Sequence, residues 1–159
     1  MAATVVVDVQ IEADATSVPA DEEIRDCLAA TLRRARPDVA GQVEMAVRVV
    51  DEEEGRALNR QFRNQDKATN VLAFPVAADT LPEHEPQPLG DIVLCGPLVE
   101  REAAEQGKAA ASHWQHLLVH GALHLLGFDH DTDAAAAAME SLECEILAQR
   151  GIADPYRGQ

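Results

Sequence analysis

The pattern of apolar and polar positions predicts strands at four places in the first two thirds of the chain. Residues 4–12 (TVVVDVQIE) are rich in valine and partly alternating, and residues 42–50 (QVEMAVRVV) place every second residue on one apolar side. Both patterns are typical of strands. Residues 69–76, which end at Pro75 and Val76, and the short apolar run at 90–96 are predicted as two more strands.

Apolar residues at helical spacing fill the remaining stretches. Helices are predicted at residues 19–36, 51–62, 97–107, 108–127 and 131–151. In the helix at 51–62 we expect Leu58 and Phe62 to face the interior. Gly127 and Gly151 are placed to end the last two helices, because glycine adopts the left-handed conformation of a helix terminus without strain.

These elements of unequal length predict an α+β fold, with a mixed sheet of about four strands packed with about five helices. A chain of 159 residues, 47% of them hydrophobic, fits a single domain over residues 1–159. Residues 77–88 contain three prolines and three acids and are predicted as a surface loop. The strand order does not follow from the pattern.

The composition also predicts where in the cell the protein is located. No apolar run approaches the roughly 18 residues that span a membrane, and the first residues are acidic where a secretion signal is basic. The three cysteines are odd in number and far apart, so we expect them to be reduced and mostly buried. They are Cys27, Cys95 and Cys144. Together these features predict a cytoplasmic protein without a membrane partner.

The formal net charge of −15 opposes binding to nucleic acids at long range. Any contact with RNA would therefore depend on a local basic patch. Arg56, Arg60, Arg63 and Lys67 are spaced by four, three and four residues, which places them along one side of a helix. The alternative is an ordinary solvated face next to the acidic run at 51–54.

The strongest chemical pattern is HGALHLLGFDH at residues 120–130. His120 and His124 are four residues apart on the predicted helix, so both rings can reach one ion. Gly127 ends that helix and lets the chain turn, which can bring His130 to the same ion. Three imidazoles leave one position open for water, as in catalytic zinc sites, although imidazole also suits nickel, copper and iron.

Other polar residues near the motif are candidates for supporting roles. His116 is also four residues from His120 and could replace a ligand, but it lies outside the glycine turn, so we rank it and His113 as supporting or packing residues. Asp129 and Asp91 could each orient a ligand ring by accepting its second N–H.

The spacing HxxxHxxGxxH also occurs in metzincin metalloproteases, which carry a glutamate directly after the first histidine as the general base. This chain has Gly121 at that position. A protease would therefore lack its base, and the sequence disfavours peptide hydrolysis.

The histidine motif, together with LNRQFRNQDKATNVLAFP and LGDIVLC in that order, resembles the YbeY family of bacterial endoribonucleases that mature ribosomal RNA. The resemblance covers roughly residues 45–156. It implies a metal-dependent, single-strand-specific endoribonuclease, generally described with zinc, that acts in 16S rRNA 3′-end maturation and ribosome quality control. By position in the motifs, His120, His124 and His130 match the metal ligands of the family, and Arg63 matches its functionally important arginine.

The residues are compatible with such chemistry. A metal lowers the pKa of bound water toward 7 and acts as a Lewis acid, so no carboxylate is needed at position 121. Arg63 would stabilise the charge of the transition state, and Arg56, Arg60 and Lys67 would hold flanking phosphates of single-stranded rRNA.

Two alternatives remain open. In the first, the protein is a ribosome-assembly factor that binds the small subunit, its ribosomal proteins or an assembly GTPase, with incidental nuclease activity. Its acidic surface would favour basic protein partners. Against this stands the absence of a cysteine near the triad, since structural zinc normally has four protein ligands. In the second alternative, the protein is a metal-dependent hydrolase of another substrate.

Overall fold

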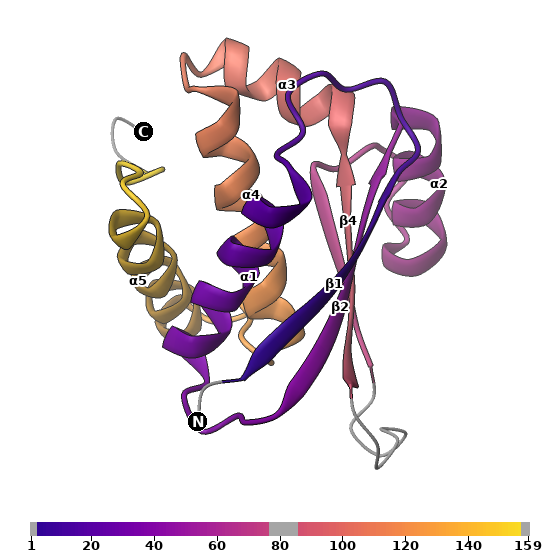
Figure 1. The fold of residues 1–159 in the computed structure, drawn as a ribbon. Helices are drawn as coiled ribbons and strands as arrows, with labels where there is room; N and C mark the ends of the chain where they lie inside the picture. The colour runs from indigo at the N-terminus through magenta and orange to yellow at the C-terminus, as the bar shows by residue number, and fades with distance from the viewer. Residues whose placement is uncertain (1–2, 77–85, 157–159) are drawn as a thin grey trace.

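The computed structural model describes residues 3–76 and 86–156 of the chain. In chain order the elements are β1 (Thr4–Ile11), α1 (Asp21–Ala35), β2 (Gln42–Val50), α2 (Glu52–Arg63), β3 (Val71–Pro75), β4 (Gln87–Cys95), α3 (Gly96–Glu105), α4 (Ala110–Leu125) and α5 (Asp133–Gln149) (Figure 1). Within the described ranges, each strand and helix lies where the apolar pattern predicts it, to within a few residues at the ends.

The strands form one sheet in the order β1-β2-β4-β3. β1 and β4 each run parallel to β2, whereas β3 pairs antiparallel with β4 at one edge. Parallel neighbours need a crossover, and α1 provides it between β1 and β2. The predicted α+β fold with a mixed sheet is therefore confirmed, and the strand order is now known.

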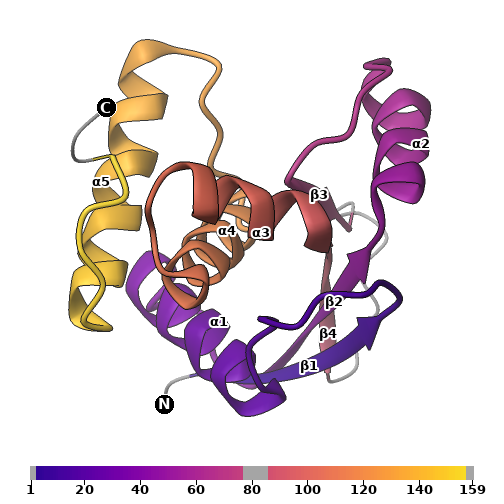
Figure 2. The same cartoon turned by 90° about the horizontal axis from the view of Figure 1, so that it is seen from above.

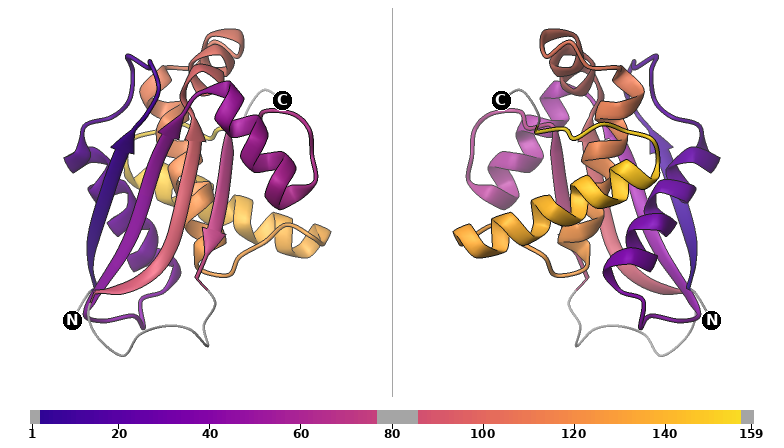
Figure 3. Two further views of the ribbon diagram at one scale, coloured as in Figure 1. Left: turned by 90° about the vertical axis from the view of Figure 1, so that its right-hand side faces the viewer. Right: turned by 90° about the vertical axis from the view of Figure 1, so that its left-hand side faces the viewer.

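Helices α1, α4 and α5 lie on one side of the sheet, and α2 lies on the other (Figures 1 and 2). The main core lies between the sheet and the layer of α1, α4 and α5. There, Met45 and Ile92 of the sheet belong to one buried cluster with Leu118 and Leu123 of α4. α4 contacts both β3 and β4, and α5 runs obliquely across the direction of the strands (Figure 3). This packing fixes α4 beside the β3 edge.

Among the described helices, α2 is the one that covers the opposite face of the sheet. Leu58 packs, partly buried, on a small second cluster that includes Leu72, as expected. The prediction for Phe62 was wrong, because its side chain is 56% exposed and only meets the ring of Phe74 edge-on at a centroid distance of 5.1 Å. β3 is the edge strand, so no further strand lies beyond it to cover the end of α2.

The predicted surface loop at 77–88 was too long at its C-terminal end. Residues 77–85 lie outside the described residues, but Gln87 and Pro88 already belong to β4 and pair with β2. Proline is accepted there because the register shifts at this point, just before Met45 of β2, and a bulge tolerates the missing N–H.

Two expectations from composition can be compared with the described residues. No helix among them is long and apolar enough to cross a membrane. All three cysteines are free: Cys27 and Cys95 are buried and Cys144 is partly buried.

Candidate metal centre

The three histidines of the motif meet at the C-terminal end of α4. Gly127, with a φ of 96°, ends the helix, and the N–H of Phe128 donates to the carbonyl of Leu123 at 3.0 Å, which closes the turn. The turn brings back His130, whose ring centroid lies 5.2 Å from that of His124. The predicted left-handed turn at Gly127 therefore brings His130 to the other two histidines, as the spacing of the motif predicts.

One ring nitrogen from each of His120, His124 and His130 lies within 4.8 Å of the others. The Nε2 atoms of His120 and His124 are 3.2 Å apart. His120 and His124 are partly buried, and His130 is exposed. Three imidazole nitrogens converging from two sides fit a single divalent ion that keeps an open coordination position.

Glu143 of α5 orients His120, the first candidate ligand, a role that the sequence did not predict. Its Oε1 lies 2.8 Å from Nδ1 of His120. Because an ionised carboxylate only accepts hydrogen bonds, Nδ1 carries the proton and Nε2 presents its lone pair to the metal position. His116 and Tyr156 also bind the carboxylate, with their Nε2 and hydroxyl at 2.7 and 2.6 Å from Oε2.

The surroundings of Glu143 keep it charged although it is fully buried. Burial by itself would raise the pKa of its carboxyl, but the three hydrogen bonds outweigh that effect and lower the pKa to about 2. The sequence did contain a signal for it. Glu143 is an acid on the inward face of α5, four residues after Met139 and three before Ile146, which are both fully buried.

His124, the second candidate ligand, is held in its neutral form. Burial, together with the positive charges of the neighbouring histidines and of Arg63, lowers the pKa of His124 to about 4. At pH 7 its lone pair is therefore available to a metal. Arg63 lines the same cavity as the three histidines.

A cavity of about 480 Å³ opens beside the three histidines. α4, β3 and the loop after α2 form its walls, and Arg63 and Lys67 both line it. Neither side chain forms an ion pair or hydrogen bond with the part of the chain that the structure describes. Asn59 supports this loop from below, because its buried amide donates to the carbonyl of Lys67 at 2.8 Å.

The basic row predicted along one side of the helix is divided. Arg56 does not line the cavity; its guanidinium pairs with Asp66 through bonds of 2.8 and 3.0 Å. Arg60 lies 3.9 Å from the same carboxylate. The helix ends at Arg63, and the chain reverses through Asn64 in the left-handed conformation, so Asp66 returns alongside the first two arginines.

Of the candidates for orienting a ligand ring, only His116 joins the network, through Glu143. Asp129 instead accepts a hydrogen bond from the N–H of Asp131, at 3.3 Å, within its own turn. Asp91 is exposed and, because side chains alternate along a strand, points away from the face on which its neighbour Ile92 packs against α4. Neither aspartate contacts a ligand ring among the described residues.

Gly121 is explained by packing. A Cβ atom at this position would lie 2.8 Å from Cγ2 of Ile92, so α4 could not approach β4 as closely with any other residue there. The position that carries the general base in metzincins therefore packs against β4 in this fold. This agrees with the sequence, which disfavours peptide hydrolysis at this site.

Comparison with known proteins gives a consistent picture. The family model described as "Endoribonuclease YbeY" matches residues 8–151. An endoribonuclease YbeY of Xylella fastidiosa is 51% identical over 150 residues, covering 91% of this chain and 88% of the relative. That of Cellvibrio japonicus is 47% identical over 150 residues, covering 94% and 82%.

The fold has a counterpart among solved structures. The solution structure of TM1509 from Thermotoga maritima superposes with a TM-score of 0.55 at 23% identity, covering 96% of this chain and 99% of that one. The family resemblance and the enzyme class predicted from the motifs are confirmed by the family model and the relatives. The chain belongs to the YbeY family of endoribonucleases.

Proposed function

We propose that this protein is a metal-dependent endoribonuclease that cleaves single-stranded rRNA, acting in 16S rRNA 3′-end maturation and ribosome quality control. The observation that carries the proposal is one cavity into which the three histidines, Arg63 and Lys67 all open. A metal position and two unpaired cations in one cleft suit a phosphodiester, which carries a negative charge before and during cleavage.

His120, His124 and His130 would hold the metal, and Zn²⁺ is the ion we propose. Their neutral nitrogen donors and the open fourth position fit it. When bound, such a metal supplies Lewis acidity toward a phosphoryl oxygen and lowers the pKa of coordinated water. Glu143 serves this arrangement by fixing the ring of His120 so that Nε2 faces the ion.

Arg63 is the residue that we assign to the reacting phosphate. Its side chain lines the same cavity as His124 and has no carboxylate partner among the described residues, so its fork of N–H donors is free for two phosphoryl oxygens. Lys67, on the same rim, would bind a neighbouring phosphate. Arg63 would act on charge that grows in the transition state, which is where a fixed cation accelerates a reaction most, whereas Lys67 would contribute to binding.

Arg56 and Arg60 would extend this path along α2. The ion pair of Arg56 with Asp66 is more than half exposed, and such surface pairs contribute little to stability. A phosphate can therefore displace Asp66 at little cost. The exchange would leave Asp66 unpaired next to the RNA, so we expect these two arginines to contribute less than Lys67.

The acidic surface favours selection of the RNA by its ribosomal context. With a net charge of −15, the protein gains little from long-range attraction to free RNA. Basic ribosomal proteins of the small subunit, or an assembly GTPase, could instead bring the cavity to its target in the cytoplasm. A role mainly in assembly, with incidental cleavage, is the second candidate, and the charge favours it.

Cleavage of an end-labelled, unstructured RNA by the purified protein tests the proposal. Arg63→Ala, His124→Ala and a chelator-treated sample should all lose cleavage, whereas Arg33→Ala, which removes an exposed arginine of α1, should keep it. Cleavage that survives in all three samples would identify a contaminating ribonuclease. A wild-type protein that binds metal but cleaves nothing would favour the assembly role.

A further inference from the structure

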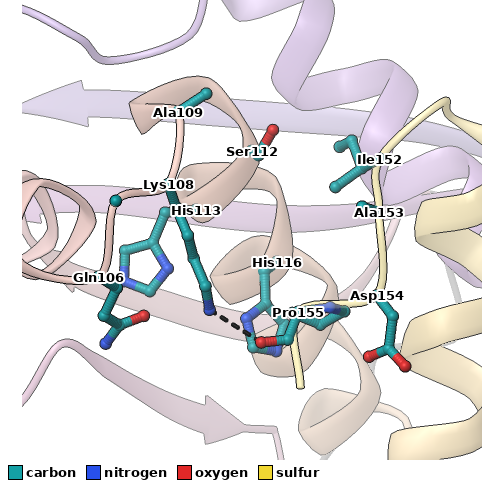
Figure 4. Close-up of a pocket in the computed structure, with 11 residues that line it drawn as sticks. Gln106, Lys108, Ala109, Ser112, His113, His116, Ile152, Ala153, Asp154 and Pro155 are labelled. Atoms are coloured by element: carbon teal, nitrogen blue, oxygen red, sulfur yellow. Dashed lines mark hydrogen bonds between the residues drawn. The ribbon is translucent and has the colours of Figure 1, made fainter. Parts of the chain in front are cut away.

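A second cavity, of about 350 Å³, lies at the N-terminal end of α4 and shares no lining residue with the metal-centre cavity. Its walls are the turn between α3 and α4, the first turns of α4, and the segment at 152–155 that follows α5 (Figure 4). No part of the proposed cleavage chemistry uses it. We call it the α4 entrance cavity.

Two histidine rings that line this cavity each have one buried nitrogen without a partner among the described residues. Nδ1 of His113 and Nδ1 of His116 are buried and form no hydrogen bond with the described residues, and the side chain of His113 is only 5% exposed. Figure 4 shows one nitrogen of each ring turned toward the space that the Lys108 side chain crosses. A buried polar atom without a partner destabilises the protein, so two of them on neighbouring turns of α4 would gain from a ligand with complementary groups.

The hydrogen bond made by the other nitrogen of each ring determines which groups a ligand must present. Nε2 of His113 lies 3.0 Å from Oε1 of Glu102, and Nε2 of His116 lies 2.7 Å from Oε2 of Glu143. Each carboxylate only accepts, so a neutral ring at either position carries its proton on Nε2 and offers Nδ1 as a lone-pair acceptor. The ligand must therefore present hydrogen-bond donors to both Nδ1 atoms.

The other residues that line the cavity limit the chemical class of the ligand. The Lys108 ammonium donates to the carbonyl of Pro155 at 2.9 Å and keeps two further N–H donors, and its charge disfavours a cationic ligand. Ala109 begins α4 without a side-chain cap, so the first N–H groups of the helix also remain as donors. Ile152 and Pro155 supply apolar surface. The cavity thus suits a neutral, flat group that carries both donors and acceptors.

We propose that the α4 entrance cavity binds one unpaired nucleobase with an exocyclic amino group, from a nucleotide of the RNA away from the cleaved bond. An amino group carries two N–H donors, one for each unpaired histidine nitrogen, and the ring acceptors of the base would face Lys108. This inference rests on RNA as the substrate in the proposed function. A protein amide could offer the same donor, but RNA is what the enzyme class acts on.

Hydrogen bonds connect this cavity to the metal centre by two routes. Glu143 joins His116 to the ligand His120. Glu102 joins His113 to Asn70, which lines the metal-centre cavity and donates to the same Oε1 at 3.0 Å. A base held in the entrance cavity would therefore contact a hydrogen-bond network that reaches His120 and Asn70.

Imidazole ¹⁵N spectra of the zinc-loaded full chain test the proposal. Cytidine and uridine are the probes, because they have the same size and cytidine carries the amino group that uridine lacks. Cytidine should shift the Nδ1 signals of His113 and His116, and uridine should bind at least about tenfold more weakly. Ala109→Trp, which fills the cavity, should abolish the cytidine shifts, and Ala111→Trp, an exposed control outside the lining, should keep them.

The outcomes separate this inference from the proposed function. Equal binding of the two nucleosides, cytidine shifts that survive Ala109→Trp, or no shifts in a preparation that cleaves RNA would each overturn the entrance cavity as a base site. Cytidine shifts in a preparation that does not cleave RNA would support the site and count against the proposed function alone.

Discussion

The carboxylate of Glu143 provides the sharpest prediction, because three donors meet at its two oxygens. We expect Glu143→Gln to weaken metal binding while the fold survives. Glutamine has the same shape, but it offers one acceptor oxygen and an NH₂ group that only donates. His116, His120 and Tyr156 all bind this side chain. The amide cannot accept from both sides at once, so at least one donor loses its partner.

The structure sets the size of the effect. A hydrogen bond to a charged group contributes about 1.5–3 kcal/mol, and one such bond holds the ring of His120. If the amide turns its NH₂ toward Nδ1, that ring must change tautomer and direct a proton at the metal position. At 1.4 kcal/mol per factor of ten, the loss corresponds to a metal affinity lower by about 10–100-fold, which is the range for partners of this kind.

The assay is competition for Zn²⁺ against a chelator of known affinity, with thermal unfolding of the metal-free proteins measured in parallel. Glu140→Gln is the matched control, because Glu140 is an exposed acid on the same helix. An unchanged zinc affinity in Glu143→Gln, with wild-type unfolding, would refute the role of Glu143 as the residue that orients His120. Equal losses in both variants would show that only overall charge matters.

Three further predictions concern other parts of the molecule. Arg63→Lys should lower turnover without changing metal content, and full activity would contradict its transition-state role. Gly121→Ala should destabilise the protein by about 1–3 kcal/mol in urea unfolding, because the new Cβ would meet Ile92; unchanged stability would contradict this. Hydrogen bonds from Ser17, chiefly from its hydroxyl, lower the pKa of Glu100. The stability they give is present above the unfolded-state pKa near 4.5 and lost as pH falls through the lower folded-state pKa, so Glu100→Gln should flatten the acid side of the stability profile.

Local patterns in the sequence predicted most of the fold and the clustering of the three histidines. His120 and His124 share one helix, and the turn at Gly127 lies within the same eleven residues as His130, so the helix and its terminal turn together bring the three rings close. The order of the strands is a different matter, because it depends on which elements pack together across the whole chain. Alternation along each strand contains no such information.

Residues that act across elements were the ones that sequence reasoning missed or misplaced. Glu143 meets His120 from another helix, 23 positions along the chain, and no spacing rule connects the two. Asp66 pairs with Arg56 only because the chain reverses between them. Phe62 has the spacing of an inward residue, yet it lies near the edge strand β3 and its side chain remains exposed. In each case a distant segment, rather than local periodicity, decides the environment.

The histidines of α4 show how one helix can serve two cavities. His113, His116, His120 and His124 follow one another at intervals of three or four residues and so form a single stripe. A carboxylate fixes the proton on His113, His116 and His120, but it does so at Nε2 in the first two and at Nδ1 in His120. The free lone pair therefore faces the entrance cavity in the first two residues and the metal position in His120. Because Glu143 holds both His116 and His120, a change at either ring shifts the carboxylate that the other depends on, so ligands in the two cavities should be coupled.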